Sequence, residues 1–304
     1  MRVEYFNVLY FLFIFLGIAS IILTIWFLNK KSEKFRYWFL FGLLLSAFII
    51  HFLKIFIFPY TLIDSGILRK VSFENVCAVS TLVFPWIYLS KNKTLKDFMV
   101  MLGITSGLLT FLIPIDAVSP FFDGRPLAEW MGVEGPVHRE LFGIGSLELV
   151  RFYYTHLIII LVPFVMMFYK IHQISIKRAF WPPIYLIGLM VVIFINELIL
   201  TAVGWVPKVE LFDPSKRNPS IIFGIKPDVK GMAMIVLIFV PSFMRLAHPS
   251  GFEYLLPVVW MIIPILIYGS IIAFIYCFIY DRAETKKFIK KLFRKQVDSE
   301  IASV

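Results

Sequence analysis

The chain has 304 residues, of which 60% are apolar or aromatic and only 16% are charged. A soluble domain usually carries about 25% charged residues, so this composition argues against a water-soluble globule and excludes a disordered chain. Two cysteines are too few for a disulfide-stapled module, and the net charge of +10 suits a membrane protein with cationic cytoplasmic loops. The composition therefore predicts a polytopic helical membrane protein.

Seven apolar runs approach or exceed the roughly 20 residues that a helix needs to cross the hydrocarbon. They lie near 5–28, 36–58, 73–90, 96–114, 147–170, 179–204 and 254–280. The first run is too long for a signal-peptide core and lacks a small-residue cleavage site, so we expect it to remain in the protein. The predicted fold is an all-α bundle of seven transmembrane helices, forming one domain over 1–280.

The connecting segments alternate in their content of lysine and arginine. Four, three, three and seven of these residues lie in 29–36, 91–96, 170–178 and the tail, against one or two each in 1–4, 59–72 and 115–146. Cations favour the cytoplasmic side. We therefore predict an N-terminus outside, a cytoplasmic C-terminus and an odd number of crossings.

An odd number of crossings leaves the short apolar segment 232–243 as a re-entrant or interfacial piece. The tail, 281–304, is predicted to be basic, amphipathic and cytoplasmic, and it has no aromatic platform for nucleic acid. The long loops 115–146 and 205–231 are expected to cap the outer mouth. Membrane lipids are the expected partners, and the absence of nucleotide-binding and metal-binding motifs predicts no cofactor.

Polar residues of five predicted helices share one depth, close to the outer leaflet, whereas the inner halves are almost wholly apolar. They are His51 and Lys54; Glu74, Asn75, Cys77 and Ser80; Thr105, Ser106 and Thr110; Glu148, Arg151, Thr155 and His156; and Asn196 and Glu197. An ionisable group at the bilayer centre costs about 2.5–3.5 kcal/mol on insertion scales, so such groups face one another or a wet cavity. We predict one polar cavity that opens toward the outer leaflet; separate snorkelling of these side chains is the alternative.

Several of these residues have a simpler structural explanation. Lys54 alone can snorkel to the headgroups, and Glu148 can simply pair with Arg151 three residues later. Asn196 and Glu197 can join helices by hydrogen bonds. Three loop histidines are expected to be solvated: His138, His172 and His248.

Cys77 is the candidate nucleophile. A thiol becomes reactive when a base or a cation lowers its pKa, and His156 and Lys54 are predicted at about the same depth. Cys277 lies in an apolar run near the inner leaflet, so we expect it to be a small apolar residue with no disulfide to Cys77.

Three segments carry a family resemblance: VSFENVCAVSTLVFPWIYL (71–89), KTLKDFMVMLGITSGLLTFLIP (93–114) and LVRFYYTHLIIILVPFVMM (149–167). Over nearly the whole chain, their order and spacing resemble the YwaF-like family of bacterial integral membrane proteins. That family is distantly similar to eukaryotic TMEM-type lipid acyltransferases and to androgen-induced-type lipid hydrolases. The resemblance implies a seven-helix membrane fold and a lipid as substrate.

The resemblance assigns positions as well. Cys77 in ENVCAVS, His156 in RFYYTH and Asn196 in FINELIL match polar positions of the family. The chain departs from the family pattern at Asn75, where the family has a histidine, and near Ala47, where the family often has an acidic residue.

Acyl transfer is the first functional hypothesis. Cys77 would attack an ester carbonyl, His156 would act as general base and then acid, and Asn196 and Asn75 would orient the imidazole or donate to the oxyanion. Lys54 or Arg151 would hold a phosphate headgroup. The predicted substrate-binding set is His51, Lys54, Asn75, Arg151 and Glu197.

Two other hypotheses stay open. Intramembrane ionisable residues are also typical of a transporter or ion-coupled carrier, although no polar track leads inward. The third hypothesis is a non-catalytic lipid-binding or assembly protein, in which the polar cluster holds helices together. The lysine, isoleucine and phenylalanine content suits an AT-rich bacterial genome, so we expect the protein in a bacterial plasma membrane. The sequence leaves the oligomeric state open.

Overall fold

A computed structural model gives the fold of the chain. It describes residues 3, 5–58, 60–62, 66–114, 147–209, 211, 219–225, 230–247 and 253–301, and only the backbone at 230–233, 253–254 and 292–301. The loop 115–146, with His138, lies outside the described residues, as do parts of the loop 205–231 and His248.

Six helices of the described chain are long and apolar enough to cross a membrane. They are α1 (Val8–Leu28), α2 (Glu33–Leu53), α4 (Lys93–Leu112), α7 (Leu147–Phe168), α8 (Trp181–Ala202) and α10 (Val259–Tyr280). Apolar α3 (Val76–Leu89) has only 14 residues, fewer than a span needs. The chain is therefore a mostly helical, multi-pass membrane protein in a lipid environment, and a seventh crossing stays a prediction.

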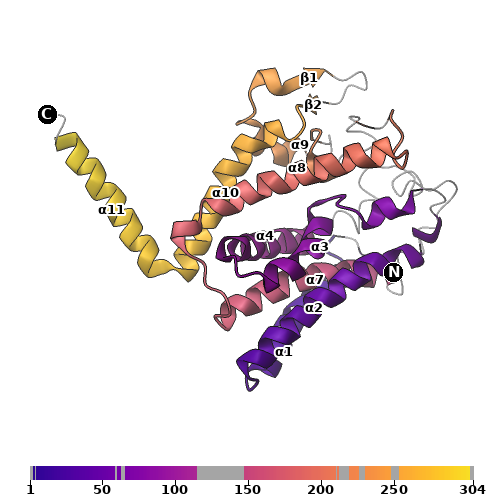
Figure 1. The fold of residues 1–304 in the computed structure, drawn as a ribbon, viewed down its shortest axis with the longest axis horizontal. Coiled ribbons are helices and arrows are strands. Elements are labelled where there is room, and N and C mark those ends of the chain that lie inside the picture. Colours follow the sequence, from indigo (N-terminus) through magenta and orange to yellow (C-terminus); the bar gives the residue numbers. More distant parts are fainter. Residues whose placement is uncertain are drawn as a thin grey trace.

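Shorter elements complete the architecture (Figure 1). The 3₁₀ helices are η1 (Lys54–Phe56), η2 (Tyr60–Leu62), η3 (Ile67–Val71), η6 (Ile176–Arg178), η7 (Pro219–Ile221) and η9 (Ser242–Met244). The first half of the segment predicted to be re-entrant, 232–243, lies in α9 (Lys230–Leu237), whose eight residues are too few to span a bilayer. Helix α11 (Arg282–Ile301) extends away from the bundle.

The chain is mostly helical, as predicted, but the apolar run expected from about residue 254 begins with a strand. Strand β1 (Arg245–Ala247) pairs antiparallel with β2 (Glu253–Leu255), so these backbone groups form a ladder. Helix α10 consequently begins only at Val259, after Pro257 and a residue with positive φ, Val258. Proline disfavours the helical conformation in the residue before it, which fits an extended strand at this point.

The long helices run back and forth, so the bundle has two ends. Tyr10, early in α1, donates its hydroxyl proton to the carbonyl of Leu112, at the end of α4. Tyr88, late in α3, donates to the carbonyl of Tyr37, early in α2. Helices α1, α3 and α7 begin at the first end, and helices α2, α4 and α8 finish there. We call it the Glu148 end. The opposite end, where α10 ends and α11 begins, is the Asp97 end.

Apolar packing fills the middle of the bundle, and α7 lies at its centre. Ile159, Val162, Val165 and Met166 of α7 are buried in the main hydrophobic cluster together with residues of α2, α3, α4 and α8. Helix α4 approaches α7 closely because it presents a glycine: a Cβ at Gly103 would lie 2.6 Å from the Ile159 carbonyl oxygen.

This close approach predicts that Gly103→Ala destabilises the protein. The new methyl group would press on backbone that cannot yield, and overpacking of this kind costs about 1–3 kcal/mol. The matched control is Gly188→Ala in α8, because a Cβ there meets nothing within 4 Å. Thermal unfolding in detergent should show a lower midpoint for Gly103→Ala alone; equal midpoints would contradict the packing.

Candidate functional site

A buried ion pair lies where α2 gives way to η1 at the Glu148 end. The Lys54 ammonium is 3.6 Å from one carboxylate oxygen of Glu74, and Lys70 is 3.9 Å from the other. Lys54 is only 4% exposed. Its side chain therefore points into the protein and does not snorkel.

Tyr60 joins this pair to a second one on α7. Its hydroxyl donates to a Glu148 carboxylate oxygen over 2.8 Å, and the Arg151 guanidinium pairs with the same carboxylate. The Lys54 ammonium and the Arg151 guanidinium lie 5.5 and 5.9 Å from the centre of the Tyr60 ring. Burial and the negative Glu148 raise the pKa of Tyr60 well above its ordinary value, so the phenol stays a donor.

His51 adds an imidazole to the same cluster. It is 3% exposed, and its buried Nε2 atom has no hydrogen-bond partner among the residues that the structure describes. Lys54, Glu74 and Arg151 are the charged groups that interact electrostatically with the ring.

Cys77 lies in the first turn of α3. Asn75 is the N-cap, and its side-chain oxygen accepts from the backbone N–H of Ala78 over 2.8 Å. The N–H of Val76 donates to the Ser220 hydroxyl. Cys77 is the second residue of this helix. The oxygen of Asn75 is committed to the cap of the helix.

His156 is held in one tautomer by its own helix. Its Nδ1 lies 2.7 Å from the carbonyl oxygen of Phe152, four residues earlier on α7. A carbonyl only accepts, so Nδ1 donates its proton, and Nε2 of the neutral ring carries the lone pair. His156 is 7% exposed. The local geometry thus prepares Nε2 to take a proton.

Asn196 and Glu197 lie in the last two turns of α8. The Asn196 amide donates to the Ser72 hydroxyl over 3.1 Å, which ties α8 to the segment before α3. Glu197 is fully buried. The imidazole of His156 is oriented by its hydrogen bond to the carbonyl of Phe152. A catalytic role for Asn196 and a substrate-binding role for Glu197 stay predictions.

The predicted site residues therefore gather at one end of the bundle but in different surroundings. His51, Lys54 and Arg151 share the charged cluster with Tyr60, Glu74 and Glu148. Cys77, His156 and Asn196 come from α3, α7 and α8, and α3 packs against both of the other helices. Sequence reasoning missed Tyr60, because a tyrosine in a connecting segment carries no periodic signal.

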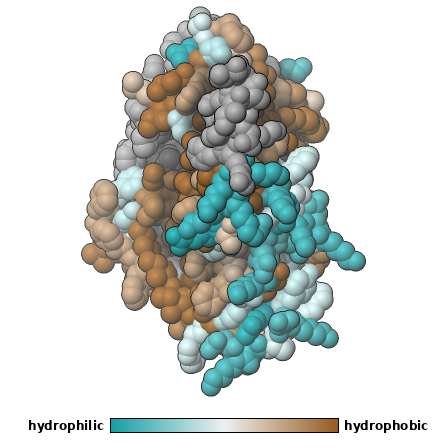
Figure 2. Space-filling view, turned by 90° about the vertical axis from the view of Figure 1, so that its left-hand side faces the viewer, coloured by the Kyte–Doolittle hydropathy of each residue, from teal (hydrophilic) through white to brown (hydrophobic). Residues whose placement is uncertain are grey.

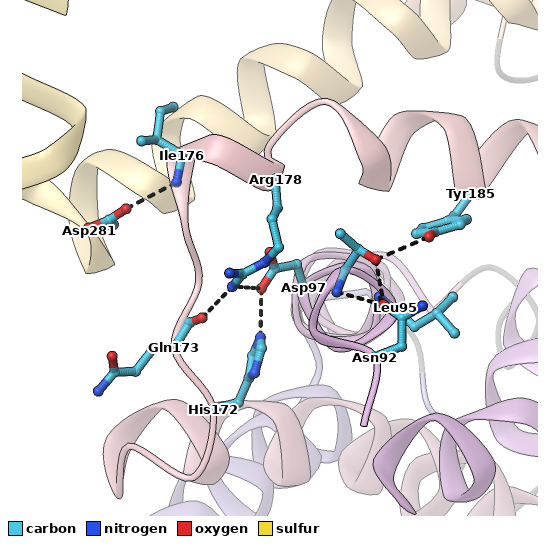
Figure 3. Close-up of polar contacts among 10 residues, drawn as sticks. Asn92, Leu95, Asp97, His172, Gln173, Ile176, Arg178, Tyr185 and Asp281 are labelled. Atoms are coloured by element: carbon cyan, nitrogen blue, oxygen red, sulfur yellow. Dashed lines mark hydrogen bonds and ion pairs between the residues drawn. The ribbon is translucent and has the colours of Figure 1, made fainter. Parts of the chain in front are cut away.

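A second buried polar network occupies the Asp97 end (Figure 3). Asp97 of α4 is fully buried, and its carboxylate accepts from Arg178 over 2.7 and 3.1 Å. His172 Nε2 lies 2.6 Å from the same carboxylate. The guanidinium of Arg178 also donates to the carbonyl of Gln173.

This network corrects two predictions. His172 is buried and paired, not solvated, and the Asp97 end, which was predicted to be inner and almost wholly apolar, contains a charged network. A signal was present in the sequence: Asp97 is an acid within an apolar helix, and such an acid requires a partner. The partners come from the segment between α7 and α8, which periodicity does not connect to α4.

Apolar side chains separate the two polar ends. Along α7, the buried residues between His156 and His172 are Ile158, Ile159, Leu161, Val162, Val165 and Met166, together with Ile160, Pro163 and Met167. Within the described ranges, no hydrogen bond or ion pair links one polar end to the other. The same part of the chain has no group of three or more His, Cys, Asp or Glu residues suited to a metal.

Comparison with known proteins identifies one family. The sequence model of the TMEM164 family matches residues 3–206, which cover α1 to α8 and every predicted site residue. No curated protein and no solved structure matches the chain. The match confirms a TMEM-type membrane family; the YwaF-like resemblance and the acyltransferase or hydrolase activity it implies stay predictions.

The network at the Asp97 end predicts a large loss of stability in Asp97→Asn. Removing the carboxylate charge leaves the Arg178 guanidinium without its buried counter-ion, and breaking a buried pair costs about 3–5 kcal/mol. Glu284→Gln is the control, because it removes the acid of the exposed Glu284–Lys287 pair on α11. In chemical unfolding, the midpoint of Asp97→Asn should lie well below that of Glu284→Gln. Similar midpoints would mean that the network does not stabilise the bundle.

Proposed function

The chain belongs to the TMEM164 family, and we propose that it is a membrane-embedded enzyme that transfers acyl groups from lipids. Cys77 is the proposed nucleophile and His156 the general base. The observation that carries the proposal is the hydrogen bond from His156 Nδ1 to the Phe152 carbonyl, which leaves Nε2 able to accept a proton.

The proposed reaction proceeds in two steps. The thiol proton of Cys77 moves to Nε2 of His156, and the thiolate attacks the ester carbonyl of a lipid. The bond between that carbon and the alkoxy oxygen breaks, and the oxygen takes the proton from the imidazolium. A thioester on Cys77 and a lysolipid result.

The second step returns the enzyme to its starting state. The acceptor hydroxyl gives its proton to Nε2 of His156, and its oxygen attacks the thioester carbonyl. The carbon–sulfur bond breaks, and the sulfur takes the proton back. Water as acceptor makes the enzyme a lipase, whereas a second lipid makes it a transferase.

The start of α3 supports the role of Cys77. A thiolate at the second helical residue meets the positive end of the helix dipole, as would an oxyanion that forms beside it. The N-cap bond of Asn75 fixes this turn. Because Asn75 and Asn196 already hold structural hydrogen bonds, we propose positioning roles for both.

The charged cluster supports a lipid with an anionic headgroup. Lys54, Lys70 and Arg151 meet Glu74 and Glu148, so cations outnumber carboxylates among the described members of the cluster. Arg151 offers the planar fork that suits a phosphate. His51 Nε2, which has no partner within the described part of the chain, offers one more polar contact.

We further propose that α3 completes a seventh crossing and that the Glu148 end faces outward. The lysine-rich turns between α1 and α2 and between α3 and α4 support this orientation, because both lie at the Asp97 end. The active site would then open toward the outer leaflet of a bacterial plasma membrane.

Transport is the weaker alternative. A carrier needs a polar route from one face to the other, and apolar residues of α7 fill the space between the two polar ends. A non-catalytic lipid-binding role differs from the enzyme only in whether Cys77 reacts, so a substitution at that residue distinguishes the two.

Cys77→Ala should abolish lipid turnover without unfolding the protein, because the reaction has no other proposed nucleophile. Cys277→Ala is the matched control: this thiol is fully buried in α10, near the Asp97 end. The assay is release or transfer of a labelled acyl chain in detergent micelles or vesicles. Unchanged turnover by Cys77→Ala would exclude the mechanism.

His156→Gln should lower kcat about 10²–10⁴-fold, the usual contribution of a positioned acid–base group. Glutamine can still donate to the Phe152 carbonyl but cannot take up the thiol proton. We expect KM to change little, because the residue acts on the proton and not on substrate affinity. His172→Gln, the same substitution at the opposite end, should retain turnover; an equal loss there would point to a general structural defect.

A further inference from the structure

Helix α11 follows directly after the last turn of α10 and is anchored there. The Asp281 carboxylate accepts from the backbone N–H of Ile176 over 3.0 Å, and the buried Thr285 hydroxyl donates to the Cys277 carbonyl. These bonds fix the first turn of α11 to η6 and to α10. The start of α11 therefore has a defined depth relative to the bundle.

Aromatic residues mark that depth as the membrane interface. Tyr276 and Tyr280 stack on each other in the last turns of α10, and Trp181 stacks on Tyr185 in the first turns of α8. Tyrosine and tryptophan prefer the headgroup level, where their apolar rings and polar atoms are both satisfied. Arg282, the first residue of α11, lies against the ring of Phe278 at the same level.

The two faces of α11 differ in character. Phe288 and Ile289 lie one turn beyond the buried Thr285, and Phe288 remains 45% exposed within the chain. The exposed cations Lys286, Lys287, Lys290 and Lys291 occupy the other positions of these two turns. A helix with this arrangement satisfies both faces by lying flat at a membrane surface.

The charge of α11 argues against two other arrangements, a crossing of the bilayer and a contact with a second copy of the chain. Residues 282–301 contain seven cations and three acids, so the helix is too polar to cross a bilayer and a second copy would be repelled. Figure 2 shows the side from which α11 extends: hydrophilic side chains gather in one zone beside a broad hydrophobic surface. An anionic lipid surface complements both parts.

We propose that α11 lies on the membrane surface at the Asp97 end and binds anionic lipid headgroups through Lys286, Lys287, Lys290 and Lys291. The helix lies beyond residues 3–206, the part that matches the family. The proposal is thus independent of acyl transfer: it concerns the opposite end of the bundle and does not involve the nucleophile.

Amide hydrogen exchange on the full chain in nanodiscs tests the proposal. One set of discs contains phosphatidylcholine alone, and the other contains phosphatidylcholine mixed with phosphatidylglycerol. We expect amides of residues 286–291 to exchange at least tenfold more slowly in the anionic discs. The difference should disappear at 1 M salt, where the Debye length is about 3 Å.

The test variant replaces Lys286, Lys287, Lys290 and Lys291 with glutamine. Each lysine near an anionic surface contributes on the order of fivefold to binding, so this variant should exchange equally in both kinds of disc. A matched control makes the same change in net charge with Lys30, Lys34, Lys91 and Lys93, which are exposed at the same end. That control should keep the slow exchange in anionic discs.

Three outcomes would overturn the proposal. Exchange in α11 that is equal in both discs would mean that the helix does not bind anionic lipid. Slow exchange that persists in the α11 variant would assign protection to another contact, such as a second copy of the chain. An equal loss of the slow exchange in the control variant would mean that the overall charge, and not α11, attracts the lipid.

Discussion

A charged side chain is stable inside an apolar bundle only where it pairs with an opposite charge or forms a hydrogen bond. This constraint determines where the polar side chains of the chain lie. Lys54 meets Glu74, Glu148 meets Arg151, and Asp97 meets Arg178 and His172. The pairs occupy the two ends of the bundle. The middle is mostly apolar, apart from hydroxyl pairs such as Thr105 with Tyr276, and there α4 and α7 approach closely enough to need glycine at Gly103.

Hydrophobic runs predicted most of the fold. Each of the six long helices lies largely within a run of apolar residues, because burial in lipid requires such a run. Two features escaped prediction for physical reasons. The strand Glu253–Leu255 depends on its ladder with Arg245–Ala247, a pairing between segments that local sequence does not specify. Helix α3 is capped at Asn75 and ends at Leu89, so it is shorter than its apolar run.

The candidate site was predictable in its depth but not in its partners. Alternating cations placed Lys54, Cys77, Arg151 and His156 near one end, and the structure brings these helix ends together. The hydrogen bonds followed rules that sequence spacing alone does not reveal. Phe152 holds His156 through a backbone carbonyl, and Asn75 serves as a cap. His172 lies in a connecting segment, where a solvated side chain is the usual expectation. It is buried instead because the charge of Asp97 would be costly without a partner.

The most direct test of the account is a search for the acyl group on Cys77. The purified protein would be incubated with a lipid that carries an isotopically labelled acyl chain, quenched in acid and digested for mass spectrometry. We expect one labelled acyl group on the peptide that contains Cys77, released by neutral hydroxylamine as a thioester would be. Lipid turnover without any acyl group on Cys77 would contradict it.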